Sequence, residues 1–321
     1  MSEARKELWT VLYDTEPDAL CMVSEAARLS REKGLVCRAW LLCSEMKEDD
    51  AMRLAKAGAQ KVTHLHVPQL DCNVERAVRD FLVDAAEEEK PAVILFLSTV
   101  FSRAVAPGVA ALLNAGITAD CTKLYWDEDG NFIQSRPAFG GRTQADILSR
   151  TLPAIATVRR GVFALEEYPV EDEVPCEKLE LEKADAFCTI LEHIGSGSPL
   201  DLSRAEIIVS GGAGMGDQAR FDRLYVLADL LGGAVAASRG AVAAGLARYE
   251  RQVGQTGTTV RPKWYLAFGI SGAVQHLSGM MDSENIIAIN PDRKAPIHKM
   301  SNYSIYADAS EVIEELIKKL S

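Results

Sequence analysis

The sequence of 321 residues has no long apolar run: no stretch reaches the roughly 18 uninterrupted apolar residues that span a bilayer. No apolar stretch follows the charges at its N-terminus, so we expect neither a secretory signal nor an anchor. It also lacks a basic excess, because 35 Lys and Arg stand against 46 Asp and Glu, a net charge of −11. A general nucleic-acid binder needs a basic face. We therefore expect a cytoplasmic protein with no nucleic-acid partner and no membrane insertion.

Metal-ligand spacings are missing as well. No two of the seven cysteines stand at C-x-x-C spacing, and an odd number excludes a fully paired disulfide framework. We expect reduced, mostly buried thiols and no metal site. No His–carboxylate or Cys–His set stands out, so the sequence also predicts no catalytic residue.

The residues that are present describe an ordinary globular protein of two domains. Apolar residues make up 48% and charged residues 25%. An acidic, turn-rich stretch separates the halves, and its GSGSP segment at 195–199 is typical of a linker tip. We expect an N-terminal domain over 1–190, a linker over 191–203 and a second domain over 204–321.

Alternating apolar runs and helical patterns predict an α/β fold for the first half. The expected strands are 8–14, 35–43, 61–67 and 92–99, and the expected helices are 17–33, 49–57 and 73–89, the first two ended by Gly34 and Gly58. The apolar run 92–99 lacks polar alternation, which indicates a central parallel strand. An Asp-Gly turn at 129–130 then predicts a hairpin. With possible strands at 155–163 and 177–181, we expect a mixed sheet in this domain.

The second half repeats this winding in shorter units. Its expected strands are 205–212, 232–238, 263–271, 285–290 and 303–308, and its expected helices are 217–231 and 309–320. This pattern predicts a Rossmann-like parallel sheet.

The glycine turn SGGAGMG at 210–216 lies between a strand and a helix, where free backbone amides bind anions. It is not a complete dinucleotide fingerprint, because Asp217 takes the third glycine position. The next strand ends at Ser238 rather than at an acidic residue, so ordinary NAD binding is disfavoured. A turn that serves only packing is the alternative.

Polar turns follow the other strands of the second half. In open α/β sheets, ligands bind at that carboxyl edge. We expect a helix from Ser271 and Gly272 with free amides for phosphate, a permanent cation at Arg239, and His276 one turn along that helix. Each also has a structural alternative: Ser238 as a helix cap, Arg239 as a surface charge, Asn290 as a turn residue and His276 as a buried structural histidine. Together the turns favour a long ligand with central phosphates and a ring system at one end. The candidate binding residues are Ser238, Arg239, Val253, Gly254, Gln255, Thr256, Gly257, Ser271, Gly272, Ala273, Val274, Gln275, His276, Asn290 and Asp308.

Several segments resemble the alpha subunit of electron transfer flavoproteins. They are ASRGAVAAG, RQVGQTGTTVRPKWYLAFGISGAVQHLSGM, IIAINPDRKAPI and YSIYAD, with TADCT, SRPAFGG and ATVRRGVF in the first half. The resemblance covers nearly the whole chain. It implies a heterodimer with a beta subunit, one FAD in the C-terminal domain, and electron transfer between a flavoprotein dehydrogenase, such as an acyl-CoA dehydrogenase, and other carriers. It also implies an N-terminal domain without a cofactor that packs on the beta subunit.

The resemblance further implies a role for each candidate segment. Ser238 and Arg239 match positions beside the flavin ring, and residues 253–256 match the loop around it, with the Thr256 hydroxyl near N5. Residues 271–276 match the segment from the phosphate amides to a histidine near the pyrimidine C2 carbonyl. Asn290 and Asp308 match positions toward the adenosine half.

One position departs from the family pattern. The family usually has SGGRG, and Ala213 stands where the arginine would be. One cation is therefore missing from the expected flavin neighbourhood, and either Arg220 or Arg248 is a candidate to replace it.

Two other functions stay open at this point. One is a self-sufficient nucleotide-dependent oxidoreductase, which would need an acid or base in a substrate pocket. The other is a binding protein that kept the fold and lost FAD. The sequence does not decide whether the complex bifurcates electrons.

Overall fold

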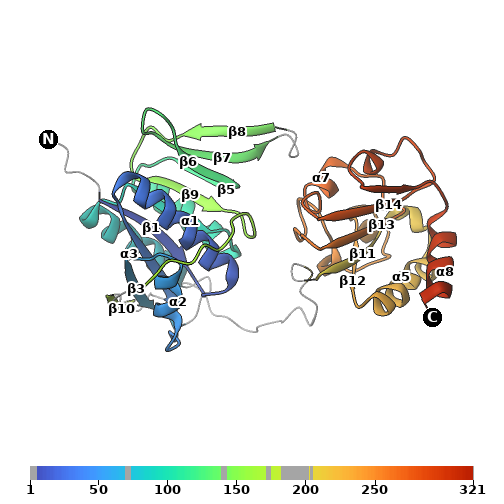
Figure 1. The fold of residues 1–321 in the computed structure, drawn as a ribbon, viewed down its shortest axis with the longest axis horizontal. Helices are drawn as coiled ribbons and strands as arrows, with labels where there is room; N and C mark the ends of the chain where they lie inside the picture. Colours follow the sequence, from blue (N-terminus) through green and yellow to red (C-terminus); the bar gives the residue numbers. More distant parts are fainter. Residues whose placement is uncertain are drawn as a thin grey trace. The chain divides into compact units, whose positions relative to one another are not determined.

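The computed structural model describes residues 6–68, 74–138, 143–170, 175–181, 202 and 205–320. The chain divides into two compact units, Met1–Leu191 and Glu192–Ser321, which Figure 1 shows as ribbons. Apart from Leu202, the expected linker 191–203 lies outside the described residues, so the exact domain limits stay a prediction. We describe each unit by itself.

The N-terminal unit is built on a seven-stranded sheet in the order β10-β3-β2-β1-β4-β9-β5. Strand β4 lies between β1 and β9 and is buried along its length, which confirms the expected central parallel strand. All the pairings described in this sheet are parallel. The strands are β1 Glu7–Leu12, β2 Val36–Cys43, β3 Lys61–His66, β4 Val93–Leu97, β5 Ile117–Cys121, β9 Ala154–Val158 and β10 Cys176–Glu180.

Helices cover both faces of this sheet. The helices α1 (Pro17–Lys33) and α2 (Asp50–Lys56) contribute to one core cluster, and α3 (Val74–Glu89) and α4 (Val100–Leu112) contribute to the other. Helix α1 matches its expected limits, and it ends where Gly34 takes a left-handed φ of 65°. Helix α4 is absent from the sequence expectations; Pro107 lies within it, at a position where proline normally disfavours a helix.

The antiparallel strands form a sheet of their own. The Asp-Gly turn joins β6 (Lys123–Trp126) to β7 (Phe132–Ala138), which confirms the hairpin, and β8 (Thr143–Leu148) pairs with β7. The expected mixed sheet is therefore wrong in this detail. The register of β5 breaks between Thr118 and Cys121, where Asp120 has a left-handed φ of 63°. The chain turns away there, and β6 to β8 pair with one another instead.

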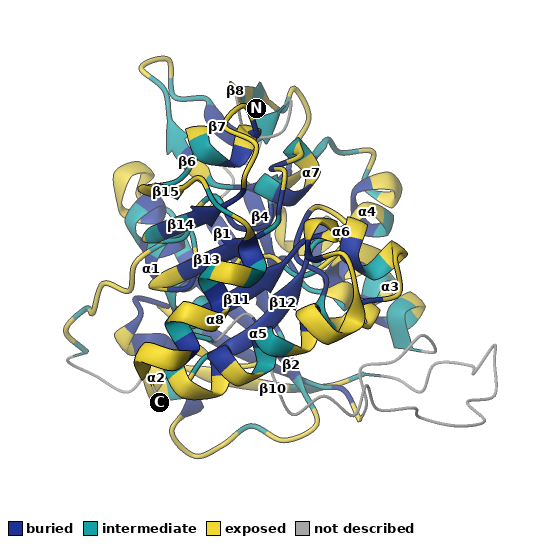
Figure 2. Cartoon of the chain, turned by 90° about the vertical axis from the view of Figure 1, so that its right-hand side faces the viewer, coloured by how far each residue is buried: buried dark blue, intermediate teal, exposed yellow. Residues whose placement is uncertain are grey.

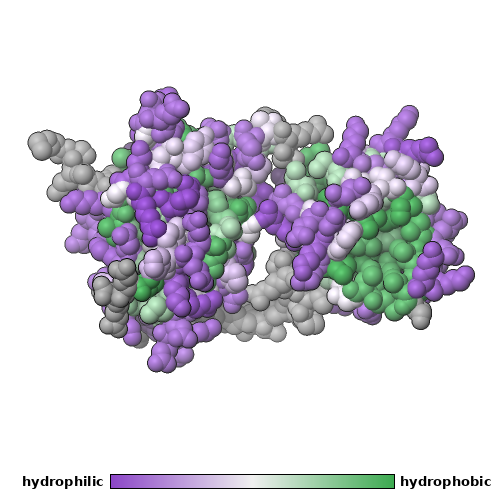
Figure 3. Space-filling view, in the orientation of Figure 1, coloured by the Kyte–Doolittle hydropathy of each residue, from purple (hydrophilic) through white to green (hydrophobic). Residues whose placement is uncertain are grey.

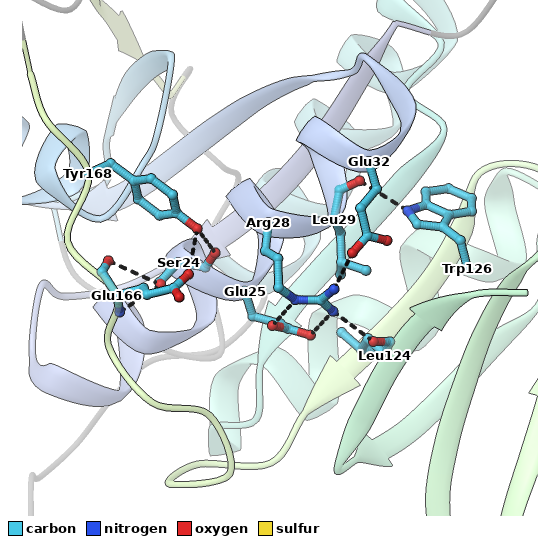
Figure 4. Close-up of polar contacts among 9 residues, drawn as sticks. All are labelled: Ser24, Glu25, Arg28, Leu29, Glu32, Leu124, Trp126, Glu166 and Tyr168. Atoms are coloured by element: carbon cyan, nitrogen blue, oxygen red, sulfur yellow. Dashed lines mark hydrogen bonds and ion pairs between the residues drawn. The ribbon is translucent and has the colours of Figure 1, made fainter.

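Hydrogen bonds between α1 and β6 connect the small sheet to this helix (Figure 4). Arg28 donates to the Leu124 carbonyl on β6 over 3.2 Å, and Trp126 on β6 donates to the Leu29 carbonyl over 3.0 Å. Glu25 orients the arginine through a 2.9 Å bond to Nε, and this hydrogen bond raises the pKa of Arg28 above its usual value. The guanidinium therefore stays charged and links helix to sheet.

The C-terminal unit contains a five-stranded parallel sheet in the order β12-β11-β13-β14-β15. This is the expected Rossmann-like arrangement. Its strands are β11 Ile207–Gly211, β12 Ala234–Ala237, β13 Trp264–Phe268, β14 Asn285–Ile289 and β15 Tyr303–Ile305, and its helices are α5 Gln218–Leu231, α6 Arg239–Ala243, α7 Val274–Leu277 and α8 Ala309–Leu320.

The two faces of this sheet are covered differently. Helices α5 and α8 pack on one face through Phe221, Leu224 and Ile313. Their outer surfaces are exposed in Figure 2, and Figure 3 shows hydrophobic surface in the region of these helices. The other face is covered mainly by residues of loops and short turns, among them Val260 and Met280. These loops include the candidate binding segments.

The cysteines only partly meet the expectation of burial. The five within the described residues are free, but Cys37 and Cys121 alone among these are buried, and Cys176 is exposed. Burial raises the pKa of Cys37 and of Cys121 to about 12, so both remain thiols. The described residues include no helix long and apolar enough to cross a membrane. They also contain no group of three or more His, Cys, Asp or Glu that could hold a metal ion.

Candidate ligand site at the carboxyl edge of the second sheet

The candidate segments meet at one edge because the strands of the C-terminal sheet are parallel. Strand β11 lies between β12 and β13, and its helix α5 leads to β12. The strand order therefore reverses between β11 and β13, and ligands of open α/β sheets bind at such a switch point. The turns after these two strands begin at Gly212 and Gly269.

The glycine turn after β11 is in direct contact with the turn after β13. A Cβ on Gly212 would lie 2.1 Å from the Gly269 carbonyl oxygen, and a Cβ on Gly214 would lie 2.7 Å from it. The Gly214 amide donates to this carbonyl over 3.1 Å. These glycines are required for the close approach of two backbones, as the packing alternative proposed.

The N-terminus of α5 already has an anionic cap. The Asp217 carboxylate accepts a 2.9 Å hydrogen bond from the Arg220 amide and pairs with the Arg220 guanidinium at 3.4 Å. A carboxylate at this position satisfies the amide that a phosphate would otherwise use. The expected anion site at this turn is therefore disfavoured, and the residue that breaks the fingerprint has a structural role.

Ser238 and Arg239 follow β12. The Ser238 hydroxyl accepts from the Ala241 amide over 3.3 Å, so the helix-cap alternative holds for this side chain. Arg239 is exposed, and within the described ranges no hydrogen bond or ion pair engages its guanidinium. A Cβ on Gly240 would lie 3.4 Å from the Ala213 Cβ. The position of the absent family arginine thus lies beside the Arg239-Gly240 backbone.

Of the two candidates to replace that arginine, Arg220 lies next to the glycine turn. A Cβ on Gly216 would be 3.8 Å from its Nη1, although Asp217 offsets its charge. Arg248 is exposed and precedes the 3₁₀ turn Tyr249–Arg251.

The loop 253–257 runs from a buried base to an exposed tip. Val253 is buried, and its amide donates to the Ala237 carbonyl over 2.9 Å at the end of β12. The Thr256 hydroxyl accepts from the Gln252 side chain over 3.0 Å. Residues 255–257 are exposed, so this loop offers a hydroxyl and backbone groups to a ligand.

The segment after β13 becomes helical later than expected. Helix α7 begins at Val274, and Gly272 has a left-handed φ of 83°. A Cβ on Gly272 would lie 2.3 Å from the Ile297 amide nitrogen, so this glycine serves a close backbone approach. Ser271, Ala273 and Gln275 are exposed. Their carbonyls accept backbone hydrogen bonds, so the groups that this segment offers a ligand are its amides rather than the start of a long helix.

His276 is buried and both of its ring nitrogens have partners. Nδ1 lies 3.1 Å from the Val253 carbonyl oxygen, and Nε2 lies 3.1 Å from the Tyr265 hydroxyl. Burial lowers the pKa of His276 to about 4, and the Val253 carbonyl opposes this shift. The structural alternative therefore describes this histidine, and the expectation of a ring facing a ligand does not match its hydrogen bonds.

The last two candidates bind backbone. Asn290 donates to the Ile270 carbonyl over 2.9 Å and accepts from the Asp292 amide over 2.9 Å, as a turn residue does. Asp308 accepts from the Ser310 amide over 2.9 Å at the start of α8. Both shape the edge through the loops they hold.

The sequence expectations missed three side chains at this edge. The Arg293 guanidinium lies 5.2 Å from the centre of the Tyr306 ring, and the His298 ring lies 4.6 Å from it. Tyr306 is 49% exposed. The sequence signal that could have indicated them is the second tyrosine of YSIYAD, Tyr306, which directly follows the end of β15.

The edge therefore offers a permanent cation at Arg239, the Thr256 hydroxyl and exposed loop residues, and its described residues include no arranged acid–base pair. Such groups suit an anionic ligand with an aromatic ring, because they bind and orient charge without transferring a proton. They lie over a parallel sheet at its switch point.

Comparison with known proteins adds independent findings. The model of the electron transfer flavoprotein domain matches residues 13–184, and that of the electron transfer flavoprotein FAD-binding domain matches residues 201–281. The chain is 42% identical to protein FixB of Clostridium saccharobutylicum, over 97% of this chain and 95% of that protein. It is 40% identical to the electron transfer flavoprotein subunit alpha of Thermoanaerobacterium thermosaccharolyticum, over 94% and 92%. It is also 38% identical to the lactate dehydrogenase (NAD(+),ferredoxin) subunit LctC of Acetobacterium woodii, over 92% of this chain and 71% of that subunit.

Proposed function

The chain belongs to the electron transfer flavoprotein family as an alpha subunit, and from this premise we propose how it carries electrons. It is an FAD-containing electron carrier that pairs with a beta subunit. It passes electrons between a dehydrogenase and other redox carriers. The flavin supplies the redox chemistry when bound, and the protein's part is to bind, orient and tune it.

The observation that best supports the proposal is a direct contact between the loop 253–257 and the segment 271–276. The loop 253–257 and the segment 271–276 are far apart in the chain, yet the Gln255 amide donates to the Gln275 carbonyl over 2.7 Å. These are the segments with the most specific family resemblance. They meet beside the switch point, where a dinucleotide binds in this type of sheet.

We assign the flavin ring to the side of the edge at Arg239 and Thr256. Arg239 has no carboxylate partner among the described residues, so its charge is available to a ligand. A guanidinium stabilises the negative charge that a flavin ring gains on reduction. The Ser238 hydroxyl caps the short helix that begins at Arg239, which fixes the backbone from which this side chain extends.

The phosphates are assigned to the backbone amides of residues 271–275 rather than to the N-terminus of α5. Asp217 caps that helix with a carboxylate, which would repel a phosphate. Asn290 and Asp308 shape the adenosine side through the turns that they fix. The candidate residues that line or shape this site are Ser238, Arg239, Val253, Gly254, Gln255, Thr256, Gly257, Ser271, Gly272, Ala273, Val274, Gln275, His276, Asn290 and Asp308.

The partner enzyme in the proposal is a flavoprotein dehydrogenase, with an acyl-CoA dehydrogenase as the first candidate. One relative is named as a subunit of a lactate dehydrogenase with NAD(+) and ferredoxin in its name. This name supports testing an electron-bifurcating complex as well. We place the protein in the cytoplasm, with the N-terminal domain packed on the beta subunit.

The test is purification of the chain with its beta subunit from co-expression, followed by acid release and identification of the flavin. We expect a coloured complex and FAD. Arg239→Gln is the test variant, and Arg220→Gln is the matched control, because it removes the same charge from a guanidinium that pairs with Asp217. A colourless complex would overturn the proposal. Turnover of a small substrate with a free nucleotide, in the absence of any dehydrogenase, would favour a self-sufficient oxidoreductase instead.

A further inference from the structure

One segment of the N-terminal unit crosses its sheet without forming a helix or a strand. It joins β9 to β10, which lie on opposite sides of β1 in the strand order. On the way, Val162, Phe163 and Tyr168 pack against the core cluster to which α1 and α2 contribute. We call residues 163–170 the strap, because they lie in extended or irregular backbone over these two helices.

The strap is fastened to α1 by Ser24. This serine lies on the buried face of the helix and is 2% exposed. Its hydroxyl donates to the Glu166 carbonyl over 3.2 Å and accepts from the Glu166 amide over 2.9 Å, as Figure 4 shows. One side chain thus pairs with both backbone groups of a residue outside any strand. Ser24 therefore does for the strap what a neighbouring strand does in a sheet.

Tyr168 fastens the strap a second time, close to the end of α2. Its amide donates to the carbonyl of Lys56, the last residue of that helix, over 2.7 Å. Its ring lies against Gly58, where a Cβ would be 2.7 Å from Cδ2 of the ring. The guanidinium carbon of Arg31 lies 3.8 Å from the ring centre, a cation–π distance. Its hydroxyl donates to the Glu166 carboxylate over 3.0 Å, so the backbone, ring and hydroxyl of this tyrosine all have partners.

The strap precedes β10, an edge strand that buries little of its own surface. Four of the five residues of β10 are exposed. Its Leu179 is half-buried and packs against the core cluster of the other face. Because burial of apolar surface is the main source of stability, a strand with one half-buried side chain is held weakly by its own packing. The position of β10 on β3 therefore depends on how the chain before it is held.

β10 also lies where the chain leaves the first unit. The Leu181 amide donates to the His66 carbonyl over 3.2 Å and so continues the pairing with β3. Leu181 is the last described residue of this unit, and the second unit begins at Glu192. The pairing of β10 therefore sets the point from which the second unit is tethered.

We propose that Ser24 and Tyr168 form a clasp that holds the strap on α1 and α2 and thereby keeps β10 on the edge of the sheet. When the clasp opens, β10 leaves β3 and the tether of the second unit becomes longer. A longer tether lowers the effective concentration of one unit at a surface of the other. Only this last step rests on the proposed function, which assigns the flavin to the second unit. Neither residue was singled out by the sequence pattern or by the family resemblance.

The first experiment is hydrogen exchange of the complex with its beta subunit. The Leu181 amide reports the pairing of β10 with β3, and the amides of β4 report the stability of the whole unit. Tyr168→Ala removes the ring and the hydroxyl, and a loss of about 1.4 kcal/mol makes opening about tenfold more frequent. We expect exchange at Leu181 to be about tenfold faster or more, with exchange in β4 unchanged. An unchanged rate at Leu181 would overturn the proposal, and so would an equal acceleration in β4.

A milder variant tests the serine. Ser24→Ala keeps a good helix former in α1 and removes both hydrogen bonds to Glu166. Loss of a hydrogen bond of about 1 kcal/mol corresponds to a factor of about five, so we expect exchange at Leu181 to be about fivefold faster. Ser30→Ala is the matched control, because Ser30 lies in the same helix and is 0% exposed. Equal effects of the two serine variants would exclude the contact with the strap as the cause.

Two tyrosine variants separate the clasp from a general loss of an aromatic side chain. Tyr168→Phe keeps the ring against Gly58 and Arg31, so exchange at Leu181 should stay within about twofold of the parent rate. Tyr125→Ala is the matched control, a tyrosine of β6 whose hydroxyl donates to Asp146 over 3.0 Å. An acceleration at Leu181 in Tyr125→Ala as large as in Tyr168→Ala would contradict the clasp.

The consequence for the tether is measured by small-angle scattering of the same complexes. We expect a larger maximum dimension in Tyr168→Ala than in the parent and in Tyr125→Ala. Identical scattering profiles, with faster exchange at Leu181, would overturn the step from β10 to the tether. Neither readout depends on bound flavin. A colourless complex with fast Leu181 exchange in Tyr168→Ala would therefore refute the proposed function and leave the clasp supported.

Discussion

Replacing Arg239 with glutamine is the most informative change at the candidate edge. The side chain is exposed, and no carboxylate of the described residues pairs with it, so its charge is not already committed to the protein. Glutamine keeps the length and a donor group but removes the charge. The fold should be unaffected, because surface substitutions of this kind change stability by less than about 0.5 kcal/mol.

The expected effect is a lower reduction potential of the bound flavin. A hydrogen bond that involves a charged group contributes about 1.5–3 kcal/mol. For a one-electron step, about 59 mV corresponds to a factor of ten, or about 1.4 kcal/mol, so the loss is about 60–130 mV. Partial solvation of the guanidinium places the expected value in the lower half of that range. Because Ala213 stands where the family usually has an arginine, the flavin potential should depend more strongly on Arg239.

The assay is an anaerobic redox titration of the complex with each variant. Arg220→Gln is the control, since it removes the same single positive charge from a different place, a guanidinium that pairs with Asp217 at 3.4 Å. A potential in Arg239→Gln within the error of the parent value, with FAD still bound, would refute the placement of this arginine beside the ring. A larger effect from Arg220→Gln would refute it as well.

Three further predictions follow from packing, burial and titration. Gly212→Ala should destabilise the C-terminal domain by about 1–3 kcal/mol through overpacking, because the new Cβ would lie 2.1 Å from a carbonyl oxygen. In Gly232→Ala the new Cβ meets no atom within 4 Å, although the residue has a φ of 65°, so the free energy of unfolding measured in urea should fall by less. A reversed order of the two variants would contradict the steric argument. Burial lowers the pKa of His276 to about 4 in the folded chain, against about 6.5 in the unfolded chain. The unfolded chain therefore binds more protons, and the free energy of unfolding should fall by up to about 3 kcal/mol from pH 6.5 to pH 4. His276→Asn should lose less stability over this pH range, and an identical pH dependence of stability would exclude this histidine as the cause. Exposed Cys176 should react with iodoacetamide at pH 8 well before Cys37, whose pKa is raised to about 12; mass spectrometry of the modified peptides checks the order, and equal rates would contradict the burial.

Local sequence signals predicted the elements whose causes are local. The helix over 17–33 follows its apolar stripe and ends at Gly34, where a left-handed residue is needed. The apolar run that forms β4 has no polar alternation because both faces of the strand are buried. Helix α4 is not among the predicted elements: it contains Pro107, which locally disfavours a helix, and burial of its apolar residues in the core stabilises it in the fold.

The candidate site was predictable in place but not in detail. Parallel strands bring their following turns to one edge, and this could be read from the winding alone. The partners of individual side chains could not, because they depend on contacts across the fold. His276 finds Tyr265 on a different element and Val253 on another loop. Asp217 looked like a defect in a fingerprint and is a helix cap.

The central claim is that a dehydrogenase supplies electrons and that this chain carries them on its bound flavin. The direct measurement is anaerobic: the complex of the chain and its beta subunit is mixed with the co-purifying dehydrogenase and that enzyme's substrate, and the flavin absorbance is followed over time. We expect the flavin of the complex to bleach only when both dehydrogenase and substrate are present. A complex whose flavin stays oxidised under these conditions, yet is reduced by dithionite, would contradict the account.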